Sequence, residues 1–143
     1  MMLTSATDII EQLQMAPHPE GGHYCEIYRA PAAGGDRSAV TSIYYLLQAH
    51  EYSAWHRIDA TEVWHFYDGA PLQVSIRPHG GDIEAHLMGI DLAAGQRPQV
   101  IIPPQAWQSA ETKGDWTLVG CTVAPGFDFA GFELAPGGVL PED

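Results

Sequence analysis

The feature that most restricts the fold of this chain is a succession of short hydrophobic runs separated by turns that contain Gly or Pro. Eleven Pro and 15 Gly are spread over 143 residues, which suits many tight turns and argues against a helical bundle. Runs this short and this regularly spaced predict the strands of an all-β sandwich or barrel. The expected strands are His23–Arg29, Val40–Leu47, Ala54–Ile58, Glu62–Tyr67, Leu72–Arg77, Ile83–Met88, Gln99–Ile102, Thr117–Val123 and Gly131–Leu134.

The N-terminal segment is the one stretch with a helical pattern. Ser5 can cap a helix, and the acidic Asp8 follows three residues later. Pro17 cannot continue the helix. We therefore expect a helix within residues 1–16, followed by a barrel over residues 17–143, in one domain. The apolar stripe of this helix consists of Ile9, Ile10 and Leu13.

The net charge of −12, from six Lys and Arg against 18 Asp and Glu, opposes binding to nucleic acids and to anionic membranes. No apolar run approaches the roughly 20 residues that span a bilayer. The N-terminus, Met1–Ser5, lacks the pattern of a signal peptide. These observations predict a cytoplasmic protein in which Cys25 and Cys121 are reduced and buried, with Cys121 in the core.

Two residues, His56 and Glu62, lie on successive expected strands and can point into the same interior space. Period-two alternation places both side chains inward and places His65 on the opposite face, where we expect a structural role. A His beside a carboxylate can act as an acid–base pair, because the carboxylate orients the imidazole and stabilises its protonated form. A buried pair that only organises the barrel is the alternative.

Four further residues are candidates for holding a ligand. The loop Pro17–Gly22 combines two prolines with two glycines, which suits a close rim that carries Glu20, although a plain helix-to-strand turn is the alternative. Tyr45 lies in a strand where its hydroxyl can point inward. Trp107 and Gln108 follow two prolines, and their flat side chains can grip a ring at the barrel mouth, although a Trp also fills a core well.

Positive charge near the expected pocket is scarce. The first expected strand carries Tyr24, Glu26 and Tyr28 on one face and ends in Arg29, and one of these residues is expected to reach the pocket. Alternation directs Arg57 away from the pocket. Because phosphorylated substrates usually need Arg or Lys, this scarcity speaks against a sugar-nucleotide substrate.

The segment from His56 to Gly69 resembles the first cupin motif, which reads His-x-His, three or four residues, Glu, six residues, Gly. Here Ile58 stands at the second His. The later segment Pro-Pro-Gln-Ala-Trp-Gln resembles the second cupin motif, with Gln105 at the usual Gly and Gln108 at the usual His. Two of the imidazoles that the cupin pattern carries are therefore replaced.

The whole chain resembles a small cupin branch that is usually labelled a domain of unknown function and sometimes called cupin-5. The resemblance implies a double-stranded β-helix, or jelly-roll, barrel that is often a homodimer. It also implies a distant likeness to sugar-nucleotide 3,5-epimerases, in which a His at the position of His56 acts as a base without a metal. It favours a rim role for Glu20. The segments that carry the resemblance are Pro17–Tyr24, Glu26, Tyr28–Arg29, Ser42–Leu47, Trp55–Arg57, Glu62–His65, Leu118–Phe127 and Phe132–Leu134.

The first functional hypothesis is an enzyme that isomerises or epimerises a small polar molecule, sugar-like or nucleotide-like, without a metal. His56 would be the base or acid and Glu62 would orient it. The residues that would hold the substrate are Glu20, Tyr45, Trp107 and Gln108.

Two alternatives stay open. The first is a metal-dependent cupin of the dioxygenase or lyase type, with His56, Glu62 and Gln108 around a divalent ion. Ile58 cannot bind a metal, and an amide oxygen binds first-row metals less well than an imidazole does. The second is a non-catalytic module that holds a small metabolite in the barrel.

Overall fold

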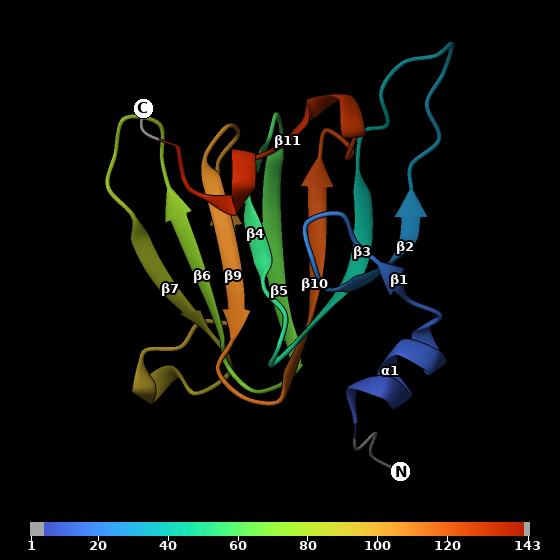
Figure 1. Cartoon of the computed structure of the whole chain (residues 1–143). Coiled ribbons are helices and arrows are strands. Elements are labelled where there is room, and N and C mark those ends of the chain that lie inside the picture. The colour runs from blue at the N-terminus through green and yellow to red at the C-terminus, as the bar shows by residue number, and fades with distance from the viewer. Residues whose placement is uncertain (1–4, 142–143) are drawn as a thin grey trace.

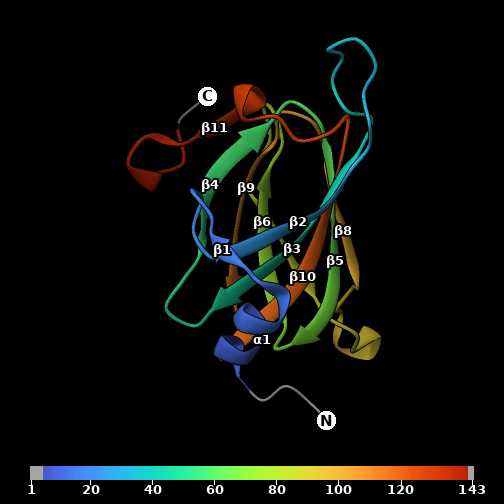
Figure 2. The same cartoon turned by 90° about the vertical axis from the view of Figure 1, so that its right-hand side faces the viewer.

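Two antiparallel β-sheets face each other in residues 5–141, the part of the chain that the computed structural model describes (Figure 1, Figure 2). The six-stranded sheet has the order β1 (Ala16–Pro17), β2 (His23–Arg29), β3 (Thr41–Gln48), β10 (Trp116–Ala124), β5 (Thr61–Gly69) and β8 (Gln99–Ile102). The five-stranded sheet has the order β11 (Phe132–Leu134), β4 (Ser53–Ile58), β9 (Trp107–Thr112), β6 (Leu72–Arg77) and β7 (Glu84–Met88). The prediction of an all-β jelly-roll barrel with one N-terminal helix is confirmed.

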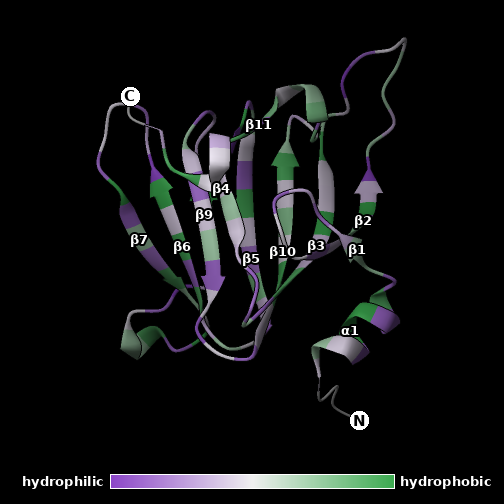
Figure 3. Ribbon diagram, viewed as in Figure 1, coloured by the Kyte–Doolittle hydropathy of each residue, from purple (hydrophilic) through white to green (hydrophobic). Residues whose placement is uncertain are grey.

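The main hydrophobic core lies between the two sheets. Alternate residues of β6 are fully buried, as expected of a strand with one face against a core, and Figure 3 shows the matching alternation of hydropathy along the strands. Trp64 and Tyr45 are the largest fully buried side chains, and their rings meet edge to face with centroids 5.8 Å apart. Cys121 also belongs to this core and is a free thiol, as predicted. Cys25 is free as well but only half-buried, which corrects the expectation that both thiols are buried.

The helix α1 (Ala6–Leu13) packs on the outer side of the six-stranded sheet (Figure 2). It begins as predicted, because the Ser5 hydroxyl accepts the backbone N–H of Asp8 at 3.1 Å. It ends at Leu13. Gln14 adopts a left-handed conformation, and the next N–H, that of Met15, bonds back to the Ile10 carbonyl at 2.9 Å. The helix thus lies within the expected residues 1–16, and the chain then pairs with β2 through Ala16–Pro17.

Strand β9 is the main element that the sequence pattern missed. Its inward positions carry Gln108 and Ala110 instead of the large β-branched or aromatic residues that mark a strand, so its alternation is weak. The pattern also missed the two-residue strand β1, and the remaining strands lie within one or two residues of their expected ends. Three short 3₁₀ segments complete the described chain: η1 (Leu92–Ala94), η2 (Phe129–Gly131) and η3 (Pro136–Gly138).

The C-terminal segment with η2 and β11 lies across the end of the two sheets that is uppermost in Figure 1. Within residues 5–141, no helix has the length and apolar character needed to cross a membrane. The prediction drawn from the first residues about export concerns residues 1–4, which lie outside the described part of the chain.

Candidate functional site

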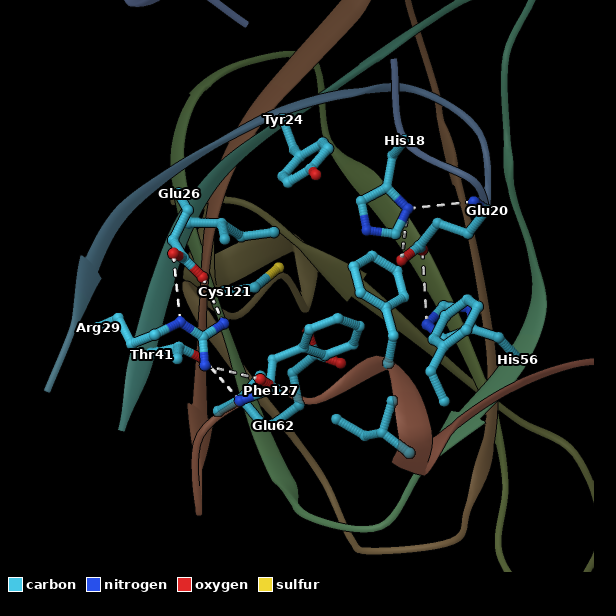
Figure 4. A pocket seen from close by; sticks show the side chains of 15 residues that line it. His18, Glu20, Tyr24, Glu26, Arg29, Thr41, His56, Glu62, Cys121 and Phe127 are labelled. Atoms are coloured by element: carbon cyan, nitrogen blue, oxygen red, sulfur yellow. Dashed lines mark hydrogen bonds and ion pairs between the residues drawn. The ribbon is translucent and has the colours of Figure 1, made fainter. Parts of the chain in front are cut away.

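A cavity of about 260 Å³ opens between the sheets beside the core. Polar groups from three parts of the chain converge on it: the loop before β2, strand β2 itself, and the pair of strands β4 and β5 (Figure 4). The residues that line it are His18, Glu20, Tyr24, Glu26, Arg29, Thr41, Ile43, His56, Ile58, Glu62, Cys121, Val123, Phe127, Phe129 and Phe132. A concave site with a few convergent polar groups is what a small-molecule site requires.

The loop between β1 and β2 holds Glu20 in this cavity. The His18 N–H bonds to the Gly22 carbonyl at 2.9 Å, and the Ala54 N–H of β4 bonds to the Glu20 carbonyl at 2.8 Å. Gly21 and Gly22 have φ of +110° and +75°. A Cβ at Gly21 would overlap the Tyr52 carbonyl, so the loop can fold this closely only with glycine there. The two glycines therefore set the position of Glu20.

His56 presents a free lone pair to the cavity. Its side chain is 2% exposed, and its Nδ1 lies 2.7 Å from the Ala54 carbonyl oxygen. Because a carbonyl only accepts, Nδ1 carries the proton, and Nε2 of the neutral ring is an acceptor. Burial lowers the pKa of His56, although the nearby Glu62 and the bond to Ala54 oppose the shift. His56 is thus a neutral base with a defined tautomer.

Glu20 faces this base. One of its oxygens, Oε2, lies 3.5 Å from His56 Nε2 and accepts a short hydrogen bond from the Ser53 hydroxyl. Burial raises the pKa of Glu20 to about 8, against the opposing hydrogen bonds of Ser53 and Tyr45. The pair has the geometry of an ion pair, but burial favours the neutral form of each partner. We therefore describe a carboxylic acid opposite an imidazole base.

His18 is a site residue that sequence reasoning missed. Its Nδ1 accepts the Glu20 N–H at 3.1 Å and lies 3.4 Å from Glu20 Oε1. Burial, with a smaller contribution from the nearby His56, lowers the pKa of His18 to about 4. The motif Pro-His-Pro-Glu-Gly-Gly indicates a rigid loop, but a pattern in sequence cannot show that its imidazole folds back against the carboxyl group two residues on.

Glu62 lines the cavity together with Glu20 and His56, and we call the buried part formed by these three residues the inner end of the cavity. Gln108 Nε2 donates to Glu62 Oε1 at 2.9 Å, and Trp64 Nε1 donates to Gln108 Oε1 at 3.0 Å. Burial raises the pKa of Glu62 to about 7, while His56 lowers it and Glu20 raises it. The buried Cys121 thiol lies against this carboxyl group, and burial raises the pKa of Cys121 well above its usual range. The thiol is therefore protonated.

The residues of the proposed metal set do not fit a metal ion. The indole N–H of Trp64 is a donor only, so it fixes the Gln108 amide with its oxygen toward the indole and its nitrogen toward Glu62. The Gln108 amide therefore presents a nitrogen donor, not its oxygen, toward Glu62, and Ile58 has no atom that could bind a metal. Within residues 5–141, no three His, Cys, Asp or Glu side chains are grouped so that they could hold a metal ion. The metal set of His56, Glu62 and Gln108 is therefore not supported.

The mouth of the cavity carries a different polar pair, Glu26 and Arg29. A bulge in β2 shifts its register with β3 between Glu26 and Tyr28. The bulge leaves Tyr28 exposed and brings Arg29 to the cavity side with Glu26, which corrects the expectation that Tyr28 shares that face. Arg29 Nη2 donates to Glu26 Oε1 at 2.7 Å, and Arg29 Nη1 donates to the Phe127 carbonyl at 3.0 Å.

Three of the predicted ligand-binding residues lie outside the lining of the cavity. The Tyr45 hydroxyl donates to the Gly21 carbonyl at 2.5 Å and so supports the loop that carries Glu20. Gln108 is fully buried and positions Glu62, as described above. Trp107 is buried beneath the guanidinium of Arg57, which lies 4.5 Å from the ring centroid. The expectation that Trp107 and Gln108 line the barrel mouth is wrong, because β9 carries both into the wall.

His65 and Arg57 lie where alternation predicts. His65 Nε2 is 3.2 Å from the Thr122 hydroxyl, and the ring stacks on Tyr67. Arg57 Nη2 lies 2.9 Å from Glu133 Oε1. Neither residue lines the cavity.

Comparison with known proteins agrees with this architecture. Protein SO0799 from Shewanella oneidensis is 38% identical over 93% of this chain and 85% of its own, with a TM-score of 0.88. A hypothetical protein from Leishmania major is 30% identical over 92% of this chain and 88% of its own, with a TM-score of 0.84.

Oxalate decarboxylase from Bacillus subtilis shares the fold alone: it is 12% identical over 82% of this chain and 29% of its own, with a TM-score of 0.64. No curated protein matches the chain. Residues 7–135 match the family described as Cupin superfamily (DUF985). The chain therefore belongs to the DUF985 family of the cupin superfamily.

Proposed function

We propose that this cupin is an enzyme that moves a proton at a carbon next to a carbonyl group, and so isomerises or epimerises a small polar molecule in the cavity. The observation that carries the proposal is the opposition of His56 Nε2 and Glu20 Oε2 at 3.5 Å inside a cavity of about 260 Å³. A neutral base and a neutral acid that face the same space suit proton transfer near neutral pH.

The proposed reaction uses the side chains of the inner end. His56 Nε2 takes the proton from the substrate carbon, and the electron pair of the broken C–H bond moves into the carbonyl group. The Glu20 carboxyl gives its proton to the carbonyl oxygen, which leaves a neutral enediol. For an isomerisation, His56 returns its proton to the neighbouring carbon of the enediol, and the O–H group on the original carbon gives its proton to Glu20. For an inversion, a solvent proton reaches the opposite face of the original carbon, the other enediol O–H proton returns to Glu20, and the His56 proton passes to solvent.

Three neighbours support these two groups. His18 holds the Glu20 backbone and lies against its carboxyl group, so it positions the acid. The negative charge of ionised Glu62 favours the imidazolium that forms on His56, as the opposing effects on their pKa values indicate. Gln108 fixes the Glu62 carboxyl group from behind.

Solvent deuterium exchange tests this proposal. Neutral aldoses, ketoses and small hydroxy ketones are incubated with the protein in D2O, and loss of the C–H signal next to the carbonyl is followed by proton NMR. We expect exchange with the unaltered protein and a loss of about 10²- to 10⁴-fold in His56→Gln, since a positioned acid or base contributes roughly that factor. His65→Gln removes an imidazole outside the cavity and should retain the rate. Equal rates in the unaltered protein and His56→Gln would contradict the proposal.

A non-catalytic binding module is the second candidate. It is favoured by the burial of the polar groups, because a dry set of convergent donors and acceptors also suits plain recognition. Under this alternative, His56→Gln weakens binding of a ligand in a titration, and no compound that binds exchanges its C–H proton with solvent.

A further inference from the structure

We propose that the ligand of this cavity is an uncharged, polyhydroxylated molecule the size of one sugar ring, and that Glu26 excludes its phosphorylated forms. The inference rests on the function proposed above and names the substrate class for that site. Four observations support it: the charges that line the cavity, the pairing of its one arginine, its size, and its apolar wall.

The first observation is the charge of the lining. Of the lysines and arginines in residues 5–141, only Arg29 lines the cavity, whereas Glu20, Glu26 and Glu62 all do. A phosphate or carboxylate group in this space would meet one guanidinium and three carboxyl groups. Of these, the neutral Glu20 exerts no repulsion, whereas Glu26 and the ionised form of Glu62 do. The whole chain has a net charge of −12, which adds to the repulsion of anions.

The second observation is that Arg29 is already engaged. Its Nη2 and Nε donate to the two oxygens of Glu26 at 2.7 and 3.4 Å, and its Nη1 donates to the Phe127 carbonyl at 3.0 Å. Figure 4 shows this pair on the opposite side of the cavity from His18, Glu20 and His56. An arginine binds phosphate through two parallel N–H donors, and Glu26 already accepts hydrogen bonds from these two donors of Arg29. An anion could use Arg29 only by displacing Glu26.

The next arginine along the rim is also paired. Arg37 donates to both carboxylate oxygens of Asp59, at 2.8 and 2.9 Å, and to the Gly126 carbonyl at 2.7 Å. It does not line the cavity. An anion beside the cavity could therefore use Arg37 only by displacing Asp59.

The third observation is size. At about 260 Å³ the cavity lies just below the roughly 300–1,000 Å³ of sites for drug-sized ligands. One sugar ring suits such a space. A nucleotide would extend into the adjoining open hollow beside Arg29 and Arg37, where both guanidinium groups are already paired with carboxylates. Of the two ligand types expected from sequence, the sugar-like one is favoured.

The fourth observation is the combination of apolar and polar groups in the lining. Phe127, Phe129 and Phe132 come from the C-terminal segment and contact one another with ring centroids 4.8 to 6.0 Å apart. Carboxyl and imidazole groups line the same cavity, and the Phe132 ring centroid lies 5.5 Å from that of His56. A sugar ring combines an apolar C–H face with a rim of hydroxyls, so it can satisfy the aromatic and the polar groups together.

A matched panel of sugars tests the inference. Glucose, fructose and mannose, their 6-phosphates, and glucosamine are titrated at millimolar concentration, and binding is read by saturation-transfer NMR. The unaltered protein should bind at least one neutral sugar at least tenfold more tightly than its 6-phosphate, and no less tightly than glucosamine binds. Glu26→Gln frees the Arg29 fork and should strengthen 6-phosphate binding at least tenfold. Glu111→Gln removes the same charge from an exposed position on β9 and should change neither affinity.

Each other result overturns the inference. If no neutral sugar binds, the inference is overturned. It is also overturned if the unaltered protein binds a 6-phosphate or glucosamine more tightly than the neutral sugars. An unchanged 6-phosphate affinity in Glu26→Gln overturns it as well. The outcome for the proposed function is separate, because it is read from deuterium exchange. If neutral sugars bind but no C–H proton exchanges with solvent, the proposed enzymatic function is contradicted and the proposed ligand class stands. If only phosphorylated sugars exchange a C–H proton, the enzymatic function stands and the ligand class is contradicted.

Discussion

The inner end and the mouth of the cavity both carry acid–base pairs, but burial gives the two pairs different properties. At the inner end, Glu20 and His56 are buried, and burial raises the pKa of Glu20 to about 8 and lowers that of His56. At the mouth, the side chains of Glu26 and Arg29 are 39% and 45% exposed and form a hydrogen-bonded ion pair. Both groups of the buried pair are neutral and can exchange protons with a ligand. Both groups of the exposed pair are charged, so this pair selects ligands by their charge.

The first and largest prediction concerns Glu20. A carboxyl group whose pKa rises from 4.5 to about 8 on folding stabilises the fold fully below pH ~4.5 and loses that contribution as the pH rises through 8. Relative to Glu20→Gln, the unaltered protein should therefore lose free energy of unfolding on the order of 4 kcal/mol between pH 4 and pH 9. Urea denaturation at both pH values measures this. Parallel losses in the two proteins would show that Glu20 is ionised in the fold.

The second prediction concerns the loop that carries Glu20. Gly21→Ala combines a left-handed φ with overlap against the Tyr52 carbonyl, so we expect a loss of about 3 kcal/mol in the free energy of unfolding. Gly80→Ala is the matched control, because Gly80 has φ of +72° with open space around its Cβ. It should cost only about 1 kcal/mol. Similar losses at the two positions would show that the close packing of the loop contributes nothing.

The third prediction concerns the support of Glu62. Gln108→Leu leaves the buried Trp64 N–H and one Glu62 oxygen without their partners, which should cost about 2 kcal/mol of unfolding free energy. The same change at Gln99, an exposed glutamine on β8, should cost less than about 0.5 kcal/mol. Thermal unfolding of the two variants side by side measures the difference, and equal costs would refute the positioning role of Gln108.

The fourth and smallest prediction concerns the mouth. Because the Glu26–Arg29 pair is exposed, Glu26→Gln should change the free energy of unfolding by less than about 1 kcal/mol, and salt should reduce the effect. Its larger effect should be on ligand choice, as described above. A loss above 2 kcal/mol in denaturant titrations would mean that the pair is structural.

Those parts of the site that depend on local alternation could be predicted from the sequence. His56 and Glu62 point inward and His65 points outward because strands β4 and β5 are regular between residues 56 and 65. The residues that carry the resemblance to cupins likewise form local sequence motifs. The expectations of a homodimer, of a cytoplasmic location and of a distant likeness to 3,5-epimerases remain predictions.

The parts that depend on irregular backbone or on distant partners could not be predicted. Arg29 reaches the cavity only because a bulge in β2 changes the parity after Glu26. His18 joins the site through the fold of a glycine loop. Gln108 stands at the position of a metal ligand in the cupin motif, but its side-chain oxygen accepts a hydrogen bond from the indole of Trp64, 44 residues away in the chain.

The central claim is that the inner end holds a neutral acid opposite a neutral base, and NMR titration of Glu20 and His56 tests it most directly. With labelled glutamate carboxyl carbons and histidine nitrogens, we predict that Glu20 titrates near pH 8 and that His56 at pH 7 is neutral with its proton on Nδ1. Assignment uses Glu20→Gln and His56→Gln. An imidazolium beside an ionised Glu20 at pH 7 would contradict the account, because the pair would then be a buried ion pair with no free base.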